Sequence, residues 1–316
     1  MWKITIFMSC FFSLTIAAQA ELTTSITESY HDGEWIESGK TEYSYDVDGN
    51  LSERSSSIWD GARWKEVSKS TFTYNGANQI TTIIDEETDV LSFNPPTITR
   101  HTLSYTNGKL TEDLAENYDG SAYSLHSRLT LVYSNDVLGY AESQLWNGAA
   151  WELTTESNKI TASYTVDGLV EAIVVENNWD GSAWLEGTRT VRTFDINDRI
   201  FSEEFQQLYD GSYADIGVKL EHEYDTNGNR TKTEYFGYSD DGWVLAYDDT
   251  FTYDTSVLMS DIVHPFVYSE LELLVLGHQN INKPLSQLES DGNGTNSSRL
   301  INSYSDDVLG NADFLL

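Results

Sequence analysis

The sequence repeats itself about every 30 residues. In each repeat a tyrosine or phenylalanine ends a β-rich run and precedes a polar turn, most clearly in residues 224–231. The steps between neighbouring anchors are 29, 31, 28, 31, 30, 30 and 29 residues. A period of this length is typical of repeat architectures, in which each unit buries its apolar surface against its neighbours. The anchors are Tyr45, Tyr74, Tyr105, Tyr133, Tyr164, Phe194, Tyr224 and Tyr253.

A second turn lies between successive anchors, and Asp-Gly or Asn-Gly forms its centre. Such pairs favour tight hairpin turns, because glycine and asparagine reach positive φ at low cost. The runs between turns alternate: Leu220, His222 and Tyr224 share one face, and the residues between them are charged. Each unit is therefore predicted to be two antiparallel strands and two turns. The second turn has full copies at residues 59–64, 118–123, 146–151 and 179–184, and looser copies at 30–35, 209–212 and 241–243.

We predict an all-β fold: an antiparallel β-hairpin repeat array of 8–9 units that forms one continuous curled or superhelical sheet. A β-propeller with two units in each four-stranded blade is the alternative. An outer-membrane barrel is disfavoured, because a bilayer requires an apolar outer face. Charges instead occur on both faces of the predicted strands, as at Arg230, Lys232 and Glu234, and both sets of turns are short.

The first 20 residues have the pattern of a secretory signal peptide. Lys3 precedes an apolar run over residues 4–16, and cleavage is expected after Ala20. A lipoprotein signal acylated at Cys10 is the weaker alternative, because the residues around Cys10 fit a lipobox poorly. We therefore expect a secreted, periplasmic or cell-surface protein.

The repeat domain is predicted to span residues 21–264. Residues 265–316 are predicted to hold a degenerate final repeat with an insertion, and to cap the sheet. Ser269 and Glu272 have the spacing of a capping box, which predicts a short helix that ends before Gly277.

The expected mature chain is strongly acidic. It carries 17 Lys and Arg against 51 Asp and Glu, a net charge of −34, and no cysteine, because Cys10 leaves with the signal. A basic surface is needed to bind nucleic acid or an anionic membrane. We therefore expect no nucleic-acid partner, no membrane insertion and no disulfide.

The turns at Tyr45-Asp46 and Tyr224-Asp225, each followed by Gly-Asn, resemble the YD repeats of Rhs-type bacterial secreted proteins. The whole array is also similar to secreted repeat proteins of marine and Bacteroidetes-type bacteria that add a Trp-Asp-Gly-Ser-Ala-Trp turn. The resemblance covers about residues 21–264. It implies an extended, coiled β-sheet and extracellular residence. The chain departs from Rhs proteins because neither an autoprotease core motif nor a toxin domain follows the repeats, so toxin delivery is not implied.

The tryptophans of the second turn are the main candidate binding residues. Flat aromatic rings stack on sugars, while neighbouring carboxylates bind hydroxyl groups. This pattern predicts a non-catalytic module that binds an extracellular polysaccharide or a surface protein. Cross-strand aromatic pairs also stabilise hairpins, so a passive structural or adhesin scaffold is the alternative. The candidate residues are Trp59, Trp64, Trp146, Trp151, Trp179, Trp184, Asp60 and Asp180.

Two anchor turns have a weak likeness to calcium loops, whose oxygen ligands alternate along the chain. Neither turn supplies the terminal glutamate of such a loop, and glycine comes one position early. Ordinary turn chemistry is therefore favoured, and we expect no cofactor, with Ca²⁺ as the alternative. The residues concerned are Asp46, Asp48, Asn50, Asp225, Asn227 and Asn229.

No catalytic motif is found. The six histidines are scattered, with no pair at metal-ligand spacing, and the sequence lacks nucleophile, phosphate-binding and dinucleotide motifs. A polysaccharide-active enzyme is a second alternative, which would require acids and aromatic rings to converge in one cleft.

Overall fold

The computed structural model describes residues 20–90, 95–134, 137–164, 171–197, 199–239, 242–258, 262–263 and 282–304. The expected signal peptide, up to residue 19, and the expected helix at Ser269 lie outside these ranges. Among the described residues, no helix is long and apolar enough to cross a membrane. The all-β prediction is confirmed for this part of the chain.

The strands are β1 (Ala20–His31), β2 (Glu34–Tyr45), β3 (Leu51–Trp59), β4 (Trp64–Tyr74), β5 (Ile80–Glu87), β6 (Thr97–Thr106), β7 (Lys109–Tyr118), β8 (Tyr123–Ser134), β9 (Val137–Trp146), β10 (Trp151–Glu152), β11 (Asn158–Tyr164), β12 (Glu171–Trp179), β13 (Trp184–Phe194), β14 (Ile200–Tyr209), β15 (Ser212–Tyr224), β16 (Arg230–Ser239), β17 (Gly242–Leu258), β18 (Ile262–Val263), β19 (Asn282–Asp291) and β20 (Asn296–Tyr304).

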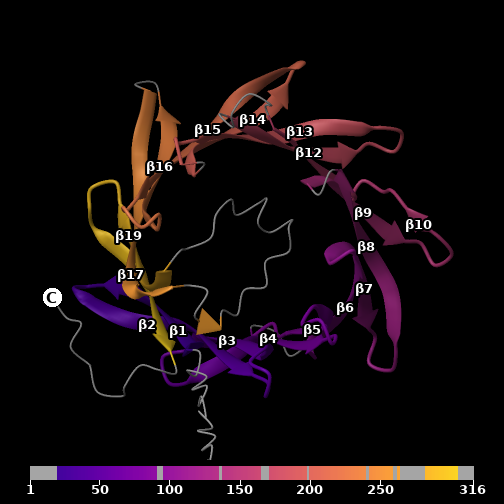
Figure 1. The fold of residues 1–316 in the computed structure, drawn as a ribbon, viewed down its shortest axis with the longest axis horizontal. Helices are drawn as coiled ribbons and strands as arrows, with labels where there is room; N and C mark the ends of the chain where they lie inside the picture. The colour runs from indigo at the N-terminus through magenta and orange to yellow at the C-terminus, as the bar shows by residue number, and fades with distance from the viewer. Residues whose placement is uncertain are drawn as a thin grey trace, which may run out of the picture.

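Eighteen of the 20 strands form one closed ring (Figure 1). Neighbouring strands pair antiparallel from β1 to β9, β9 pairs with β11, and the pairing continues to β17. From there β17 pairs with β19, β19 with β20, and β20 with β1. The two-residue strands β10 and β18 are additional: β10 pairs with β9, and β18 lies parallel to β1. The molecule is a closed antiparallel barrel.

The prediction of an open curled or superhelical array, and its propeller alternative, are therefore wrong. The pairing of β20 with β1, from Leu22 opposite Tyr304 to Ser29 opposite Ser298, joins the two ends of the sheet. Regular bulges explain the curvature. The register shifts at Tyr45, Tyr74, Tyr105, Tyr133, Phe194, Tyr224 and Tyr253. Because each bulge bends its strand and increases the twist, a bulge in nearly every repeat coils the sheet until its edges meet.

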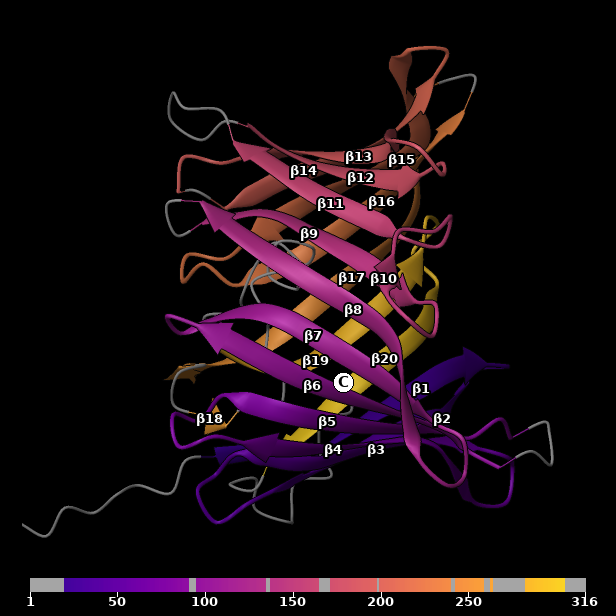
Figure 2. The same ribbon diagram turned by 90° about the vertical axis from the view of Figure 1, so that its right-hand side faces the viewer.

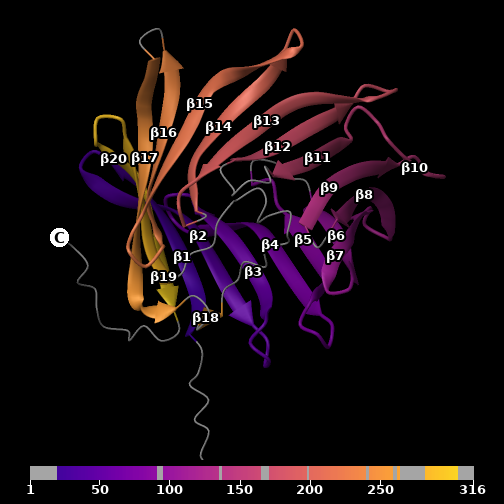
Figure 3. The same ribbon diagram turned by 45° about the horizontal axis from the view of Figure 1, so that its top comes forward.

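The two families of turns lie at opposite ends of the barrel (Figures 2 and 3). Strand direction alternates around the ring, so the anchor turns share one end and the aromatic turns share the other. At the anchor end, tyrosine hydroxyls tie neighbouring strands together. Tyr74 Oη donates to the carbonyl of Leu51 at 2.8 Å, and Tyr224 Oη donates to the carbonyl of Ile200 at 2.8 Å.

Side chains alternate between the two faces of the single-layer wall. The face that carries the anchors, here called the tyrosine face, holds most of the fully buried mid-strand side chains, such as Leu131, Ala141, His222 and Thr233. The opposite face, here called the charged face, carries residues such as Lys40. Apolar burial is limited to small clusters, one of which is formed by Leu131, Leu138 and Ala141.

Candidate functional site

Four of the aromatic turns are built around an aspartate or asparagine whose side chain bonds to its own backbone: Asp60, Asp119, Asn147 and Asp180. Asp180 Oδ1 accepts hydrogen bonds from the N–H groups of Ser182 and Ala183, both at 2.8 Å. Asp60 Oδ1 accepts from the N–H groups of Ala62 and Arg63, both at 3.0 Å. These bonds form an Asx turn, and a glycine with positive φ follows each aspartate.

These turn bonds keep the aspartates ionised. The pKa of Asp180 is lowered by the hydrogen bonds from Ala183 and Ser182. The pKa of Asp60 is lowered to about 2, first by a hydrogen bond from Lys65 and then by the backbone of its turn. The Nζ atom of Lys65 lies 3.0 Å from Asp60 Oδ2. In both turns, the Oδ1 atom of the aspartate is therefore occupied by hydrogen bonds within the hairpin.

The aromatic residues that flank each turn contact each other across the hairpin. The centroids of Trp179 and Trp184 are 5.5 Å apart with their planes at 66°, an edge-to-face arrangement. Such pairs contribute about 0.5–1.5 kcal/mol beyond the burial of their surface. The other pairs, with centroids 5.0–5.3 Å apart, are Tyr30–Trp35, Trp59–Trp64, Tyr118–Tyr123, Trp146–Trp151 and Tyr238–Trp243.

The aromatic rim is defined here as these six pairs together with Tyr213 of the β14–β15 hairpin, which lies opposite Leu208 and so has no aromatic partner across its hairpin. The structure brings each predicted tryptophan pair together with its aspartate or asparagine. It places the pairs on separate hairpins, however: β3–β4, β9–β10 and β12–β13. The candidate residues therefore follow one another around one end of the barrel and do not converge in a single cluster.

A lysine or arginine of the charged face stacks on the second ring of each rim hairpin. The cations that lie over these rings are Arg299 over Trp35 (4.5 Å), Lys40 over Trp64 (5.4 Å), Arg100 over Tyr123 (4.1 Å), Arg128 over Trp151 (5.0 Å), Lys159 over Trp184 (5.9 Å), Arg189 over Tyr213 (3.9 Å) and Lys219 over Trp243 (5.3 Å), measured to the ring centroid. Each cation belongs to the neighbouring hairpin, so the stacking joins successive hairpins.

Acidic or amide side chains hold these cations in place. Lys40 Nζ lies 2.8 Å from Glu42, Arg100 lies 2.6 Å from Glu116, and Arg299 pairs with Glu28. We did not predict these cations from the sequence. The sequence nevertheless contains a regular spacing that could have identified them. Six of the seven cations precede the ring that they cover by 23–25 residues, as Lys40 precedes Trp64 and Arg100 precedes Tyr123.

The first and second rings of the rim differ in exposure. The three tyrosines at first positions are exposed, by 40% at Tyr30, 37% at Tyr118 and 64% at Tyr238. All seven second rings are half-buried, and so are the first rings Trp59, Trp146 and Trp179.

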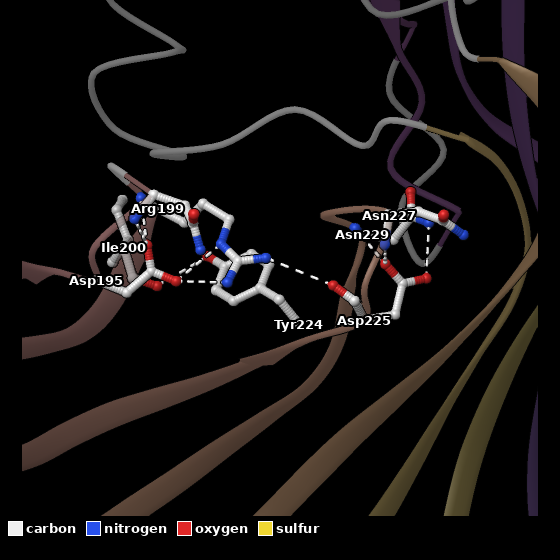
Figure 4. Close-up of polar contacts among 8 residues, drawn as sticks. Asp195, Arg199, Ile200, Tyr224, Asp225, Asn227 and Asn229 are labelled. Carbon is white, nitrogen blue, oxygen red and sulfur yellow. Dashed lines mark hydrogen bonds and ion pairs between the residues drawn. The ribbon is translucent and has the colours of Figure 1, made fainter.

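The candidate calcium ligands are occupied by turn chemistry. Asp225 Oδ1 accepts from the N–H groups of Asn227 and Asn229, both at 2.9 Å, and Asp225 Oδ2 accepts from the side-chain amide of Asn229 at 2.8 Å (Figure 4). The fully buried Asn229 amide also donates to Asn282 at 2.8 Å. In the preceding anchor turn, Arg199 bonds to Asp195 in place of an asparagine (Figure 4).

The turn at Asp46 repeats this pattern, with Oδ1 accepting from the N–H groups of Asp48 at 2.9 Å and Asn50 at 2.8 Å. Asp46 Oδ2 accepts from the amide of Asn50 at 3.2 Å. In the part of the chain that the structure describes, no group of three or more Asp, Glu, His or Cys side chains is placed to hold a metal ion. Calcium binding at these turns stays a prediction.

A buried polar chain crosses four strands of the tyrosine face, and sequence reasoning missed it. Arg192 Nε donates to Glu203 Oε2 at 2.8 Å, His222 Nε2 lies 3.2 Å from Glu203 Oε1, and His222 Nδ1 lies 3.0 Å from Thr233 Oγ1. Burial alone would raise the pKa of Glu203, but the hydrogen bond from His222 and the charge of Arg192 outweigh it and lower the pKa.

This chain joins a hydroxyl, an imidazole and a carboxylate in the order of a nucleophilic relay. Thr233 and His222 are only 1% and 3% exposed, however, so the hydroxyl is not accessible to a substrate. The arrangement satisfies buried polar groups in the barrel wall.

A second polar chain crosses the wall from β3 to β7. Arg54 donates to Ser70 at 3.3 Å, and Ser70 donates to Asp85 at 2.5 Å. His101 lies 3.8 Å from Asp85 and 2.9 Å from Asp113. The hydrogen bond to Asp113 raises the pKa of His101; burial opposes this shift, and the charges of Asp113 and Asp85 add to it.

A comparison with protein-family models finds no match, and a comparison with curated protein sequences finds none either. Among solved structures, the chain is similar to a protein of unknown function from Bacteroides fragilis (TM-score 0.31, 14% identity, covering 37% of this chain and 86% of that one). It is also similar to a porin-like protein from Bacteroides uniformis (TM-score 0.40, 10% identity, 90% and 97% coverage). A third similar structure is TcdB2-TccC3-TEV (TM-score 0.34, 12% identity, 86% and 14% coverage). At these scores the similarities carry no functional argument.

Proposed function

We propose that this protein is an exported, non-catalytic barrel that binds an extracellular polysaccharide at its aromatic rim. The observation that supports the proposal most directly is the arrangement of paired aromatic rings on six hairpins, four of which carry an Asx turn, around one end of the ring. A rigid circular array presents the same kind of contact several times. A polymeric ligand that repeats its own unit can occupy several such contacts at once, which increases the overall affinity.

The proposal places both faces of the wall in water. A barrel that spans a bilayer needs an apolar outward band. Here the charged face carries residues such as Lys40 and Arg100, and the tyrosine face carries Arg54, Arg192 and Glu203. Along the strands that the structure describes, neither face offers a continuous apolar band, whichever of them points outward. With the signal-peptide pattern, this supports a periplasmic, cell-surface or secreted location.

A passive scaffold is the second candidate function. It is favoured by the cations on the second rings and by the turn bonds of Asp60 and Asp180, since all of these groups already contribute to the wall. In this case the rim would stabilise the barrel and bind no ligand.

The experiment that separates the two functions is a glycan-array screen of residues 21–316, run with calcium and again with EDTA. The proposal predicts selective binding to one class of polysaccharide. Loss of binding in EDTA would show that binding requires a metal ion. An array without any bound glycan would contradict the proposal and favour the scaffold.

A further inference from the structure

The rings of the aromatic rim fall into two classes, and we infer that only the first ring of each hairpin binds ligand, a polysaccharide without acidic groups. The inference rests on the proposed function and names the rings and the substrate class of the same rim. The first rings are Tyr30, Trp59, Tyr118, Trp146, Trp179 and Tyr238; the second rings are Trp35, Trp64, Tyr123, Trp151, Trp184, Tyr213 and Trp243.

The second rings are already occupied. A sugar stacks on the flat face of an aromatic ring, and at Trp151 and Tyr123 that face holds a guanidinium group at 5.0 and 4.1 Å. Each cation is bound in turn: Arg100 pairs with Glu116 at 2.6 Å. A sugar that displaced the cation would have to break this ion pair and remove a side-chain contact between two neighbouring hairpins, so we assign these rings to the barrel wall.

The first rings are available to a ligand. Among the described residues, every cation found over a rim ring lies over a second ring. The tyrosines at first positions are exposed, most of all Tyr238 at 64% and Tyr30 at 40%. Exposed aromatic rings repeated on neighbouring hairpins suit the successive units of a polymer better than one small molecule.

The negatively charged aspartates of the turns disfavour a negatively charged ligand. Asp119 and Asp180 lie directly beside the first rings Tyr118 and Trp179, and hydrogen bonds within their turns lower the pKa of each. They therefore remain negatively charged at neutral pH. A polymer of uronic acids or sulfated sugars would be repelled at these turns, whereas uncharged sugars can stack on the rings and donate hydroxyl hydrogens to the carboxylates.

The test compares two matched triple variants of residues 21–316. The first, Trp59→Ala/Trp146→Ala/Trp179→Ala, removes first rings, and the second, Trp64→Ala/Trp151→Ala/Trp184→Ala, removes the second rings of the same three hairpins. Depletion isotherms are measured on insoluble cellulose and chitin as uncharged probes and on alginate gel as the acidic probe. Melting temperatures are measured in parallel.

The first triple variant is expected to bind the uncharged probe at least about tenfold more weakly, through the loss of three stacking contacts, with the smaller fall in melting temperature. The second is expected to melt earlier and to keep its affinity below its melting temperature. Should the second triple variant fail to fold, Lys40→Ala takes its place, because it removes the cation over Trp64 and leaves every rim ring in place.

The possible results are distinct. Equal loss of binding in both variants, or loss in the second only, would overturn the assignment of the rings while the proposed function stands. Stronger binding to alginate than to cellulose and chitin would overturn the substrate class. A wild-type protein that binds none of the three probes would contradict the proposed function itself.

Discussion

At the residue scale, the turns are the part of the molecule that the sequence predicts best. The Asp-Gly and Asn-Gly pairs predict hairpin turns, and Trp59 does lie opposite Trp64, as Trp179 lies opposite Trp184. The cations over the second rings could not be predicted in the same way. Lys159 belongs to β11 and Trp184 to β13, and no rule of local turn chemistry relates two residues on different hairpins.

Replacing Gly181 by alanine tests the turn chemistry of the rim. Gly181 has φ +101°, and a Cβ atom added there would meet no atom within 4 Å, so any cost comes from the backbone alone. We expect Gly181→Ala to lower the free energy of unfolding by roughly 1–2 kcal/mol, measured by urea denaturation. Gly76, in an anchor turn, is the control: its Cβ position is also open, and its φ is not positive. Gly76→Ala is expected to be neutral or to stabilise by up to about 1 kcal/mol. Equal losses in both variants would contradict the assignment.

At the scale of strands, the alternation of side chains predicts which residues share a face, but it does not predict what they bond to. The alternation correctly predicts that His222 shares one face of its strand with Leu220 and Tyr224. Its partners Glu203 and Thr233 come from β14 and β16 and depend on the register of two strand pairs. That register is set by bulges, such as the one between Phe205 and Gln206, which a two-residue period does not reveal.

The chain of residues around His101 predicts a pH dependence of stability. Because the pKa of His101 is raised in the folded state, its contribution to stability is full below its ordinary value of 6.5 and is lost as pH rises through the folded-state pKa. The difference in free energy of unfolding between wild type and His101→Gln is therefore expected to fall as the pH rises above 6.5 and through the raised folded-state pKa. The substitution of the exposed His126 by glutamine is the control. A difference that stays constant with pH, or grows, would show that Asp85 and Asp113 do not hold a protonated imidazole.

At the scale of the whole molecule, closure of the sheet is the feature that the sequence did not reveal. The repeat specifies how each hairpin joins the next, and this local pattern is the same in an open array and in a closed ring. What decides between them is the twist accumulated over all the bulges and the fit of β20 to β1. The last repeat is also irregular, because 51 residues separate Tyr253 from Tyr304, so its match to the first strand is hidden. The opposed charges of Glu28 and Arg299 lie at this seam, where Arg299 also covers Trp35.

The seam between β1 and β20 gives the most direct test of the closed barrel. Ile26 lies opposite Ile301, and directly paired residues in antiparallel strands have the Cα separation that a disulfide needs. Residues 21–316 contain no cysteine, so Ile26→Cys/Ile301→Cys introduces the only two thiols. As a control, Ile26→Cys is combined with Thr130→Cys on β8, on a different part of the ring (Figure 1).

The measurement is the fraction of intramolecular disulfide after mild oxidation of the folded protein, read from intact mass and non-reducing electrophoresis. Closure predicts a nearly complete cross-link of the monomer in Ile26→Cys/Ile301→Cys and none within the monomer in the control. An open array would keep these two thiols far apart. The absence of the intramolecular bond, or its formation only between molecules, would contradict the closed barrel.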